Sequence, residues 1–200
     1  MTTHFVHEMD RLHRELVSMC STVEELINDA VEGLQAPSRD LSRELTVRDH
    51  EIDELDIRIE EECLKILALY QPVAQDLRRV TAVLKISGEL ERVGDIAVSI
   101  ADRATAIAES GEFPMPGRLK EMAAEALLML HDSIDSYVEL NASRAKDVCR
   151  RDDGVDRLNV ELLNELRAVM TENPRLIDPG MHLFSAIRHI ERVADHATNI

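Results

Sequence analysis

The 200-residue sequence contains little of what a β-sheet or a loop-rich domain requires. Aromatic residues make up 2% of the chain, tryptophan is absent, and there are only 7 glycines and 6 prolines. Sheets favour aromatic and β-branched side chains, while turns and disordered segments rely on glycine and proline. Leucine, alanine, glutamate, arginine and methionine are abundant instead, and all of them favour helices. The composition therefore predicts an all-α protein, long enough to bury a hydrophobic core.

Basic residues are also scarce. The chain has 23 lysines and arginines against 39 aspartates and glutamates, which gives a net charge of −16. Phosphate backbones and anionic membrane surfaces should repel such a protein, so no nucleic-acid partner is expected. An acidic protein is suited to bind cations or basic partner surfaces.

Several further absences indicate the cellular compartment. The sequence has no apolar run of about 18 residues, so no membrane insertion is expected. Its first residues lack the basic and apolar regions of a signal peptide. The three cysteines, Cys20, Cys63 and Cys149, are odd in number and form no C-x-x-C motif. Reduced thiols in a cytoplasmic protein are the simplest explanation.

Apolar residues recur every three or four positions through most of the chain, which predicts amphipathic helices. Breaks are expected at Gln71-Pro72, at 111–117, at Asn173-Pro174 and at Asp178-Pro179-Gly180. The helices are expected at residues 3–34, 41–70, 73–110, 118–140, 144–170 and 181–200. The last is still in register at Ile200, so we expect it to be truncated there. Long antiparallel helices joined by short turns form bundles.

The two halves of the sequence resemble each other. Arg48-Asp49 recurs as Arg151-Asp152, Gln71-Pro72 as Asn173-Pro174, and Glu91-Arg92-Val93-Gly94-Asp95 as Glu191-Arg192-Val193-Ala194-Asp195. These motifs are displaced by 103, 102 and 100 residues in the same order. The repeat predicts two tandem three-helix bundles related by a pseudo-twofold axis, over residues 1–112 and 113–200.

Carboxylates occur in pairs four residues apart at matching places in both repeats. The pairs are Asp49 with Asp53, Glu91 with Asp95, Asp152 with Asp156, and Glu191 with Asp195. Residues at this spacing share a helical face, where like charges disfavour the helix. At 1.5 Å per residue, the first two pairs both lie roughly 27–36 Å from the Gln71-Pro72 turn. The second two pairs overlap in the same way, so each repeat is expected to gather four carboxylates.

Crowded carboxylates either have raised pKa values or recruit a cation, and all-oxygen sites suit Mg²⁺, Ca²⁺, Mn²⁺ and iron. Asn199 continues the Glu191–Asp195 face and is a candidate neutral ligand. His196 is a candidate ligand, a pH-sensitive group, or a packing residue. The alternative is that the acids are solvated, or are neutralised by their sequence neighbours Arg48, Arg92, Arg151 and Arg192. The Glu-x-x-His motif of di-iron bundles is missing, as are P-loop, dinucleotide-binding and zinc-protease motifs.

At these motifs the sequence resembles the PhoU family of bacterial phosphate-signalling regulators. Members have two three-helix units, each with a Glu/Asp-x-x-x-Asp signature, matched here by Glu91–Asp95 and Glu191–Asp195. The segment from Gln71 to Arg78 also resembles the turn before the family's third helix. The resemblance covers residues 5–200.

The resemblance implies a cytoplasmic regulator that is not an enzyme and that forms homodimers. It implies multinuclear metal clusters on the two acidic faces, with iron favoured and manganese, magnesium or zinc as alternatives. It implies partners in the ATPase of the phosphate ABC transporter and in a sensor histidine kinase. Through this two-component system the protein would act as a negative regulator of phosphate uptake and of the phosphate-starvation response. The alternatives are a metal-dependent phosphoester hydrolase and a plain helical scaffold with a solvated acidic face.

Overall fold

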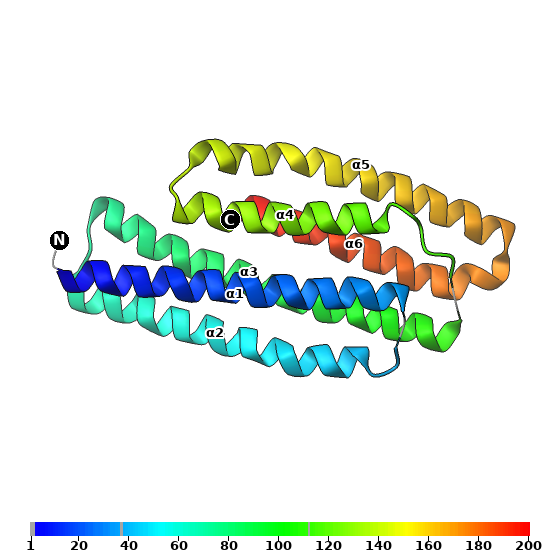
Figure 1. The fold of residues 1–200 in the computed structure, drawn as a ribbon, viewed down its shortest axis with the longest axis horizontal. Helices are drawn as coiled ribbons and strands as arrows, with labels where there is room; N and C mark the ends of the chain where they lie inside the picture. The colour runs from blue at the N-terminus through cyan, green and yellow to red at the C-terminus, as the bar shows by residue number, and fades with distance from the viewer. Residues whose placement is uncertain (1–2, 37, 112) are drawn as a thin grey trace.

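The computed structural model describes residues 3–36, 38–111 and 113–200, and over these residues it is an all-helical bundle (Figure 1). The first repeat contains α1 (Thr3–Gln35), α2 (Leu41–Tyr70) and α3 (Ala74–Ser110). The second contains α4 (Leu119–Val138), α5 (Ala142–Glu172) and α6 (Ile177–Asn199), with a 3₁₀ turn, η1 (Pro174–Leu176), between α5 and α6. The predicted all-α fold class is confirmed. No helix of the described residues is long and apolar enough to cross a membrane.

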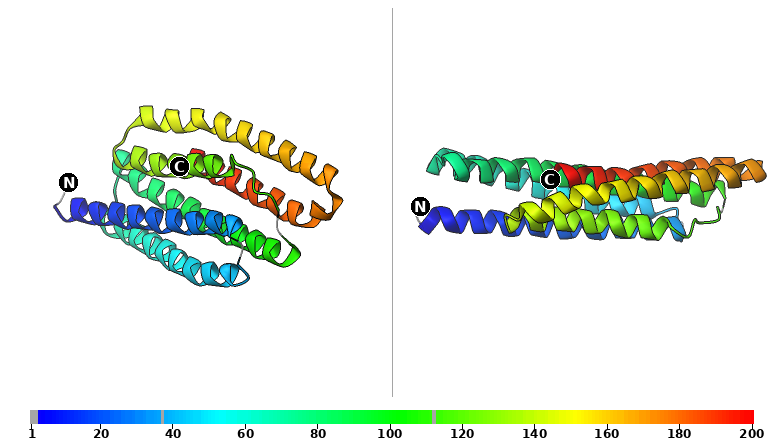
Figure 2. Two further views of the ribbon diagram at one scale, coloured as in Figure 1. Left: turned by 45° about the vertical axis from the view of Figure 1, so that its right-hand side comes forward. Right: turned by 90° about the horizontal axis from the view of Figure 1, so that it is seen from above.

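The two repeats join through four central helices. Helix α1 packs on α3 and α4, and α6 packs on α3 and α4. Helices α2 and α5 lie at opposite outer edges of the bundle, α2 against α1 and α3, and α5 against α4 and α6 (Figures 1 and 2). Each outer helix therefore forms a groove with the last helix of its own repeat, where the sequence places the carboxylate pairs.

The apolar stripe of each helix forms one continuous core. In α1 the stripe includes Leu12, Leu16, Val23 and Leu26, all of which are buried. The buried face of α3 alternates Val, Ile and Leu with small residues, among them Ala97, Ala101 and Ala104, and the small residues let the helices approach closely. Burial of aliphatic side chains contributes about 25 cal/mol per Å² of apolar surface, so this core is the main source of stability.

Helix α6 begins before the break expected at Asp178-Pro179-Gly180, so that expectation is wrong. The structure has all three residues inside α6, which begins at Ile177. Proline is tolerated in a first turn because its missing N–H would have no partner there. Gly180 is required for packing rather than for a turn, since a Cβ on it would lie 2.7 Å from Met170 Sδ and 2.9 Å from Phe113 Cε2. The chain reverses before α6 begins, at Asn173 and η1.

Candidate metal-binding faces

The first acidic face consists of Asp49 and Asp53 on α2 and Glu91 and Asp95 on α3. The structure brings these four residues together, as the helical heights predict. Burial is the main cause that raises the pKa of Asp49, and the charges of Asp53, Asp95 and Glu91 raise it further. The carboxylates therefore repel one another across the groove between α2 and α3.

Asp49 is the most buried member of this face. Its side chain is 9% exposed, its pKa is raised to about 6, and its Oδ1 has no hydrogen-bond partner among the described residues. Gly94 on α3 makes room for it, because a Cβ at that position would lie 2.6 Å from Asp49 Oδ1. A buried carboxylate oxygen without a partner costs free energy of folding, on the order of 1–3 kcal/mol.

Glu91 lies in a similar environment. Burial is the first cause of its raised pKa, followed by the charges of Asp95, Asp56 and Asp53. Asp56 was not among the predicted site residues, although its position three residues after Asp53 on α2 places it on the same helical face. The first acidic face thus extends one turn beyond the predicted set.

The second acidic face consists of Asp152 and Asp156 on α5 and Glu191 and Asp195 on α6. Burial and the charges of Asp156, Asp195 and Asp153 raise the pKa of Asp152. Burial also raises the pKa of Glu191, whose side chain is 8% exposed. Asp152 Oδ1 and Glu191 Oε2 have no hydrogen-bond partner among the described residues. This groove repeats the arrangement of the first.

One arginine forms an ion pair on the second face and has no equivalent at the same position of the first. Arg188 Nη1 donates to Glu191 Oε1 at 2.8 Å, and this contact lowers the pKa of Glu191 against the effect of burial. The equivalent residue of the first repeat, 100 positions earlier, is Gly88. Arg188 was not among the predicted site residues, although its place three residues before Glu191 is the spacing of a helical ion pair.

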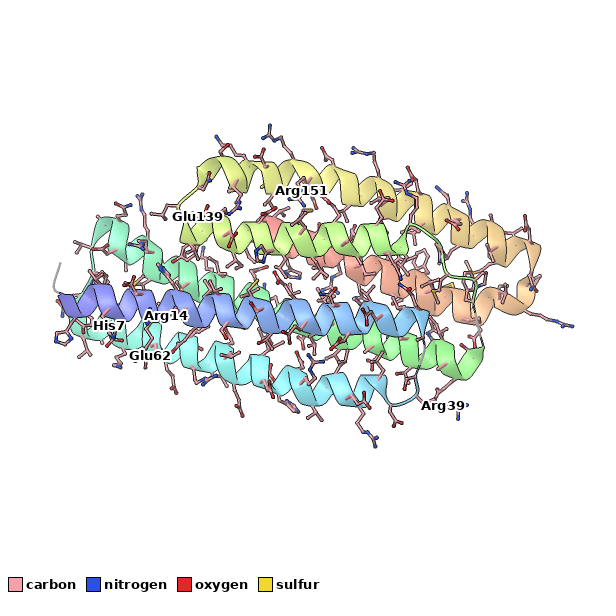
Figure 3. All side chains as sticks on the ribbon, in the orientation of Figure 1. His7, Arg14, Arg39, Glu62, Glu139 and Arg151 are labelled. Atoms are coloured by element: carbon pink, nitrogen blue, oxygen red, sulfur yellow. The ribbon has the colours of Figure 1, made fainter. Side chains whose placement is uncertain are left out.

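The arginines next to the acidic residues in sequence form no ion pair with them. Arg48 pairs with Asp29 on α1, and Arg92 pairs with Glu89 at 3.0 Å. Arg151 pairs with Glu125 at 2.7 Å and with Asp132, both on α4 (Figure 3). Arg192 forms no ion pair with any described residue, and it lines a cavity between α3 and α6 together with Arg92 and Asp95. None of these four arginines forms an ion pair with any of the eight carboxylates, although the charge of Arg92 lowers the pKa of Glu91 against the effect of burial.

The end of α6 contacts the first repeat. His196 Nδ1 lies 2.7 Å from Glu89 Oε2, and Asn199 Nδ2 donates to the same oxygen at 3.3 Å. His196 thus has a role in packing α6 on α3, which was one of its predicted alternatives. Asn199 stays a predicted ligand, but its amide nitrogen is engaged by Glu89 rather than directed at Glu191 or Asp195.

The chemistry of both faces fits a hard cation. Each has carboxylate oxygens that are buried, lack partners and repel one another, and a bound cation would satisfy all three conditions. Within residues 3–36, 38–111 and 113–200, no three His, Cys, Asp or Glu side chains already stand close enough to hold one ion. Mutual repulsion keeps bare carboxylates apart, so a cation would have to draw them inward.

Comparison with known proteins gives a consistent result. The PhoU domain model matches residues 7–104 and 119–200. A phosphate-specific transport system accessory protein PhoU homolog from Aquifex aeolicus is 37% identical over 185 residues, which are 92% of this chain and 84% of that protein. A homolog of the same name from Clostridium acetobutylicum is 32% identical over 98% of this chain and 90% of its own length. The crystal structure of PhoU from Pseudomonas aeruginosa superimposes with a TM-score of 0.91 at 34% identity, covering 98% of this chain and 94% of that one. The chain belongs to the PhoU family.

Proposed function

We propose that this protein is a metal-binding, non-catalytic adaptor that represses phosphate uptake and the phosphate-starvation response. In this role it acts in the cytoplasm, as a homodimer, between the ATPase of a phosphate ABC transporter and a sensor histidine kinase. The names of its relatives, which are accessory proteins of phosphate-specific transport systems, support a regulatory role in phosphate transport.

The observation that carries the metal-binding part is the pair of acidic faces. Asp49 Oδ1, Asp152 Oδ1 and Glu191 Oε2 are buried and lack hydrogen-bond partners among the described residues. Arg48, Arg92 and Arg151 pair with other carboxylates, and Arg192 pairs with no described residue. Arg188 is therefore the one described arginine that forms an ion pair with any of the eight carboxylates. Such a grouping lowers folding stability unless a cation balances it.

Bound ions would be held by Asp49, Asp53, Glu91 and Asp95 on one face and by Asp152, Asp156, Glu191 and Asp195 on the other. When bound, the ions would supply positive charge that neutralises each groove and fixes α2 against α3 and α5 against α6. Each outer helix would then present a defined surface to a partner. Iron is the favoured metal, and manganese, magnesium and zinc are the alternatives.

The test is the metal content of tag-free protein purified without chelator, beside that of an Asp95→Asn/Asp195→Asn double variant. We expect several ions per chain in the first protein and a loss of most of them in the second. A Glu165→Gln variant, changed at an exposed position of α5 away from both acidic faces, is the matched control and should keep its metal. Absence of metal from the unmodified protein, even after iron, manganese and zinc are added, would contradict the proposal.

The regulatory part is tested in cells. Deletion of the gene should switch on phosphate-starvation genes in phosphate-rich medium, and the double variant should fail to restore repression. An unchanged phosphate response would contradict the adaptor role. Hydrolysis of phosphoesters that is lost in Asp95→Asn would instead establish a metal-dependent hydrolase.

A further inference from the structure

A cavity of about 570 Å³ opens where α3 begins and α4 ends, at a junction between the two repeats (Figure 1). None of the described residues that line it carries a carboxylate, although the chain has 39 acidic residues. It is therefore separate from both acidic faces. The lining residues are Ala74, Gln75, Arg78, Arg79, Ala82, Tyr137 and Leu140.

One wall is a single face of α3. Gln75, Arg78, Arg79 and Ala82 follow the spacing i, i+3, i+4, i+7, which places them together along the helix. Neither arginine forms an ion pair with any described residue, and Arg79 Nε is buried without a hydrogen-bond partner among them. Two neighbouring guanidinium groups left without carboxylates in so acidic a chain mark a local site of positive charge.

The opposite wall is held in place by hydrogen bonds. Tyr137 O–H donates to the Arg79 carbonyl at 2.9 Å and lies 3.3 Å from His13 Nε2. Burial raises the pKa of Tyr137 to about 12, so its hydroxyl stays protonated at neutral pH. Burial and the nearby Arg79 lower the pKa of His13, while Asp10 opposes them. The guanidinium groups therefore dominate the charge of this site.

The backbone around the cavity adopts costly conformations. Ala74 and Leu140 have φ angles of 50° and 54°, and they are two of the three described non-glycine residues in the left-handed region. Such conformations are unfavourable for residues other than glycine, and they gather at functional sites. Both residues line the cavity, so its shape depends on them.

We propose that this cavity binds a phosphoryl group, either as free phosphate or as the phosphate ester of a small molecule. The planar guanidinium group donates two parallel hydrogen bonds to phosphate oxygens, and the Gln75 amide adds another donor. Ala82 and Leu140 supply an apolar wall against which the rest of an ester packs, and the volume is that of a small-molecule pocket. The proposal is independent of metal binding at the acidic faces.

Tyr137 gives a direct signal for the test. The chain has two tyrosines and no tryptophan, so Tyr70→Phe leaves Tyr137 as the sole strong fluorophore. In this background, fluorescence is titrated with AMP, inorganic phosphate and adenosine, and calorimetry on the unmodified protein checks the result. We expect saturable binding of AMP and none of adenosine. Equal affinities for AMP and inorganic phosphate identify the free anion as the ligand, whereas tighter binding of AMP identifies an ester.

Variants on the α3 face complete the test. Arg78→Gln removes an exposed guanidinium and should weaken binding about tenfold or more, since it deletes charge-assisted hydrogen bonds. Gln75→Glu places a carboxylate three and four residues from the two arginines and should abolish binding without loss of fold. Arg39→Gln, at the far end of the first repeat (Figure 3), is the control and should bind normally. Lack of saturable binding of both phosphates, adenosine binding equal to that of AMP, or equal losses in Arg39→Gln and Arg78→Gln would overturn the proposal.

Discussion

The two acidic faces share one plan but differ at two equivalent positions. In the first repeat Gly94 makes room for the buried Asp49, and Gly88 supplies no ion-pair partner for Glu91. In the second repeat Ala194 and Arg188 occupy these positions, and Arg188 pairs with Glu191 at 2.8 Å. The first face therefore carries more uncompensated negative charge, and the second has part of its charge balanced by the protein itself. Duplicated sites of one chain can thus have different affinities for the same cation.

The largest expected difference is in metal affinity. Because Arg188 already occupies one oxygen of Glu191, we expect ions on the second face to dissociate in a chelator at least about tenfold more readily than those on the first. Chelator titrations of Asp95→Asn and Asp195→Asn, each with one face left intact, measure the two affinities. Saturation of the tighter face at about 100 times its dissociation constant should stabilise the protein by about 2.7 kcal/mol. Equal metal affinities of the two faces would show that Arg188 does not weaken binding on the second face.

The next largest effect is expected at Asp49 in metal-free protein. Its pKa is about 6 in the folded chain, above the unfolded value of 3.8, so the folded state binds the extra proton. Stability should therefore fall as the pH rises from about 4 through 6, and the loss should be complete above that range. Asp49→Asn should reduce this slope and raise stability at pH 7.5 by about 1–2 kcal/mol, with little change at pH 4. The raised pKa values of Glu91, Asp152 and Glu191 leave part of the slope in place. Urea unfolding across this pH range, with Glu165→Gln as control, gives the measurement. A slope that is unchanged in Asp49→Asn would refute the prediction.

Gly94→Ala should destabilise the metal-free protein by about 1 kcal/mol at pH 7.5. Alanine gains about 1 kcal/mol of helix propensity, but its Cβ would lie 2.6 Å from Asp49 Oδ1 and 3.1 Å from Ile52 Cδ1. Removal of the carboxylate by Asp49→Ala should make the same change neutral or stabilising. A double-mutant cycle of thermal unfolding tests this coupling, and additive effects would show that the two residues do not interact.

The smallest effect on stability is expected when the arginine of the second face is introduced into the first face or removed from the second. Gly88→Arg places a guanidinium three residues before Glu91, and a Cβ at Gly88 meets nothing within 4 Å. It should stabilise the metal-free protein by about 0.5–1 kcal/mol and weaken metal binding on the first face. Arg188→Gly should do the reverse on the second face. If both variants keep the metal affinities of the unmodified protein, Arg188 is not the cause of the difference in affinity between the two faces.

Helical periodicity and the internal repeat were sufficient to predict the fold and the meeting of the carboxylate pairs. Heights along antiparallel helices are fixed by a constant rise per residue, so residues equally far from a turn lie at the same level. They meet when they also share the faces that the two helices turn toward each other. The start of α6 was predicted wrongly because Pro179 and Gly180 usually mark turns, whereas here a first-turn proline and a packing glycine are both compatible with helix. Neither feature is visible before the neighbours, Met170 and Phe113, are known.

The ion pairs were less predictable than the helices. Arg48 and Arg151 stand next to acidic residues in sequence, yet each crosses to the neighbouring helix, α1 or α4. Adjacent residues on a helix point about 100° apart, so sequence neighbours seldom pair. The contacts of His196 and Asn199 with Glu89 depend on how α6 packs against α3, and the sequence of either helix alone does not determine this.

The eight carboxylates of the two acidic faces lie between α2 and α3 and between α5 and α6, whereas Arg48 and Arg151 pair with residues of α1 and α4. This separation determines how the protein should respond to salt. At about 0.15 M ionic strength the screening length is about 8 Å, so repulsion spread over a surface of net charge −16 is largely removed by sodium chloride. Buried oxygens such as Asp49 Oδ1 are screened much less. Stabilisation by sodium chloride therefore reports the surface as a whole. The additional stabilisation by a divalent salt at equal ionic strength reports the two grooves.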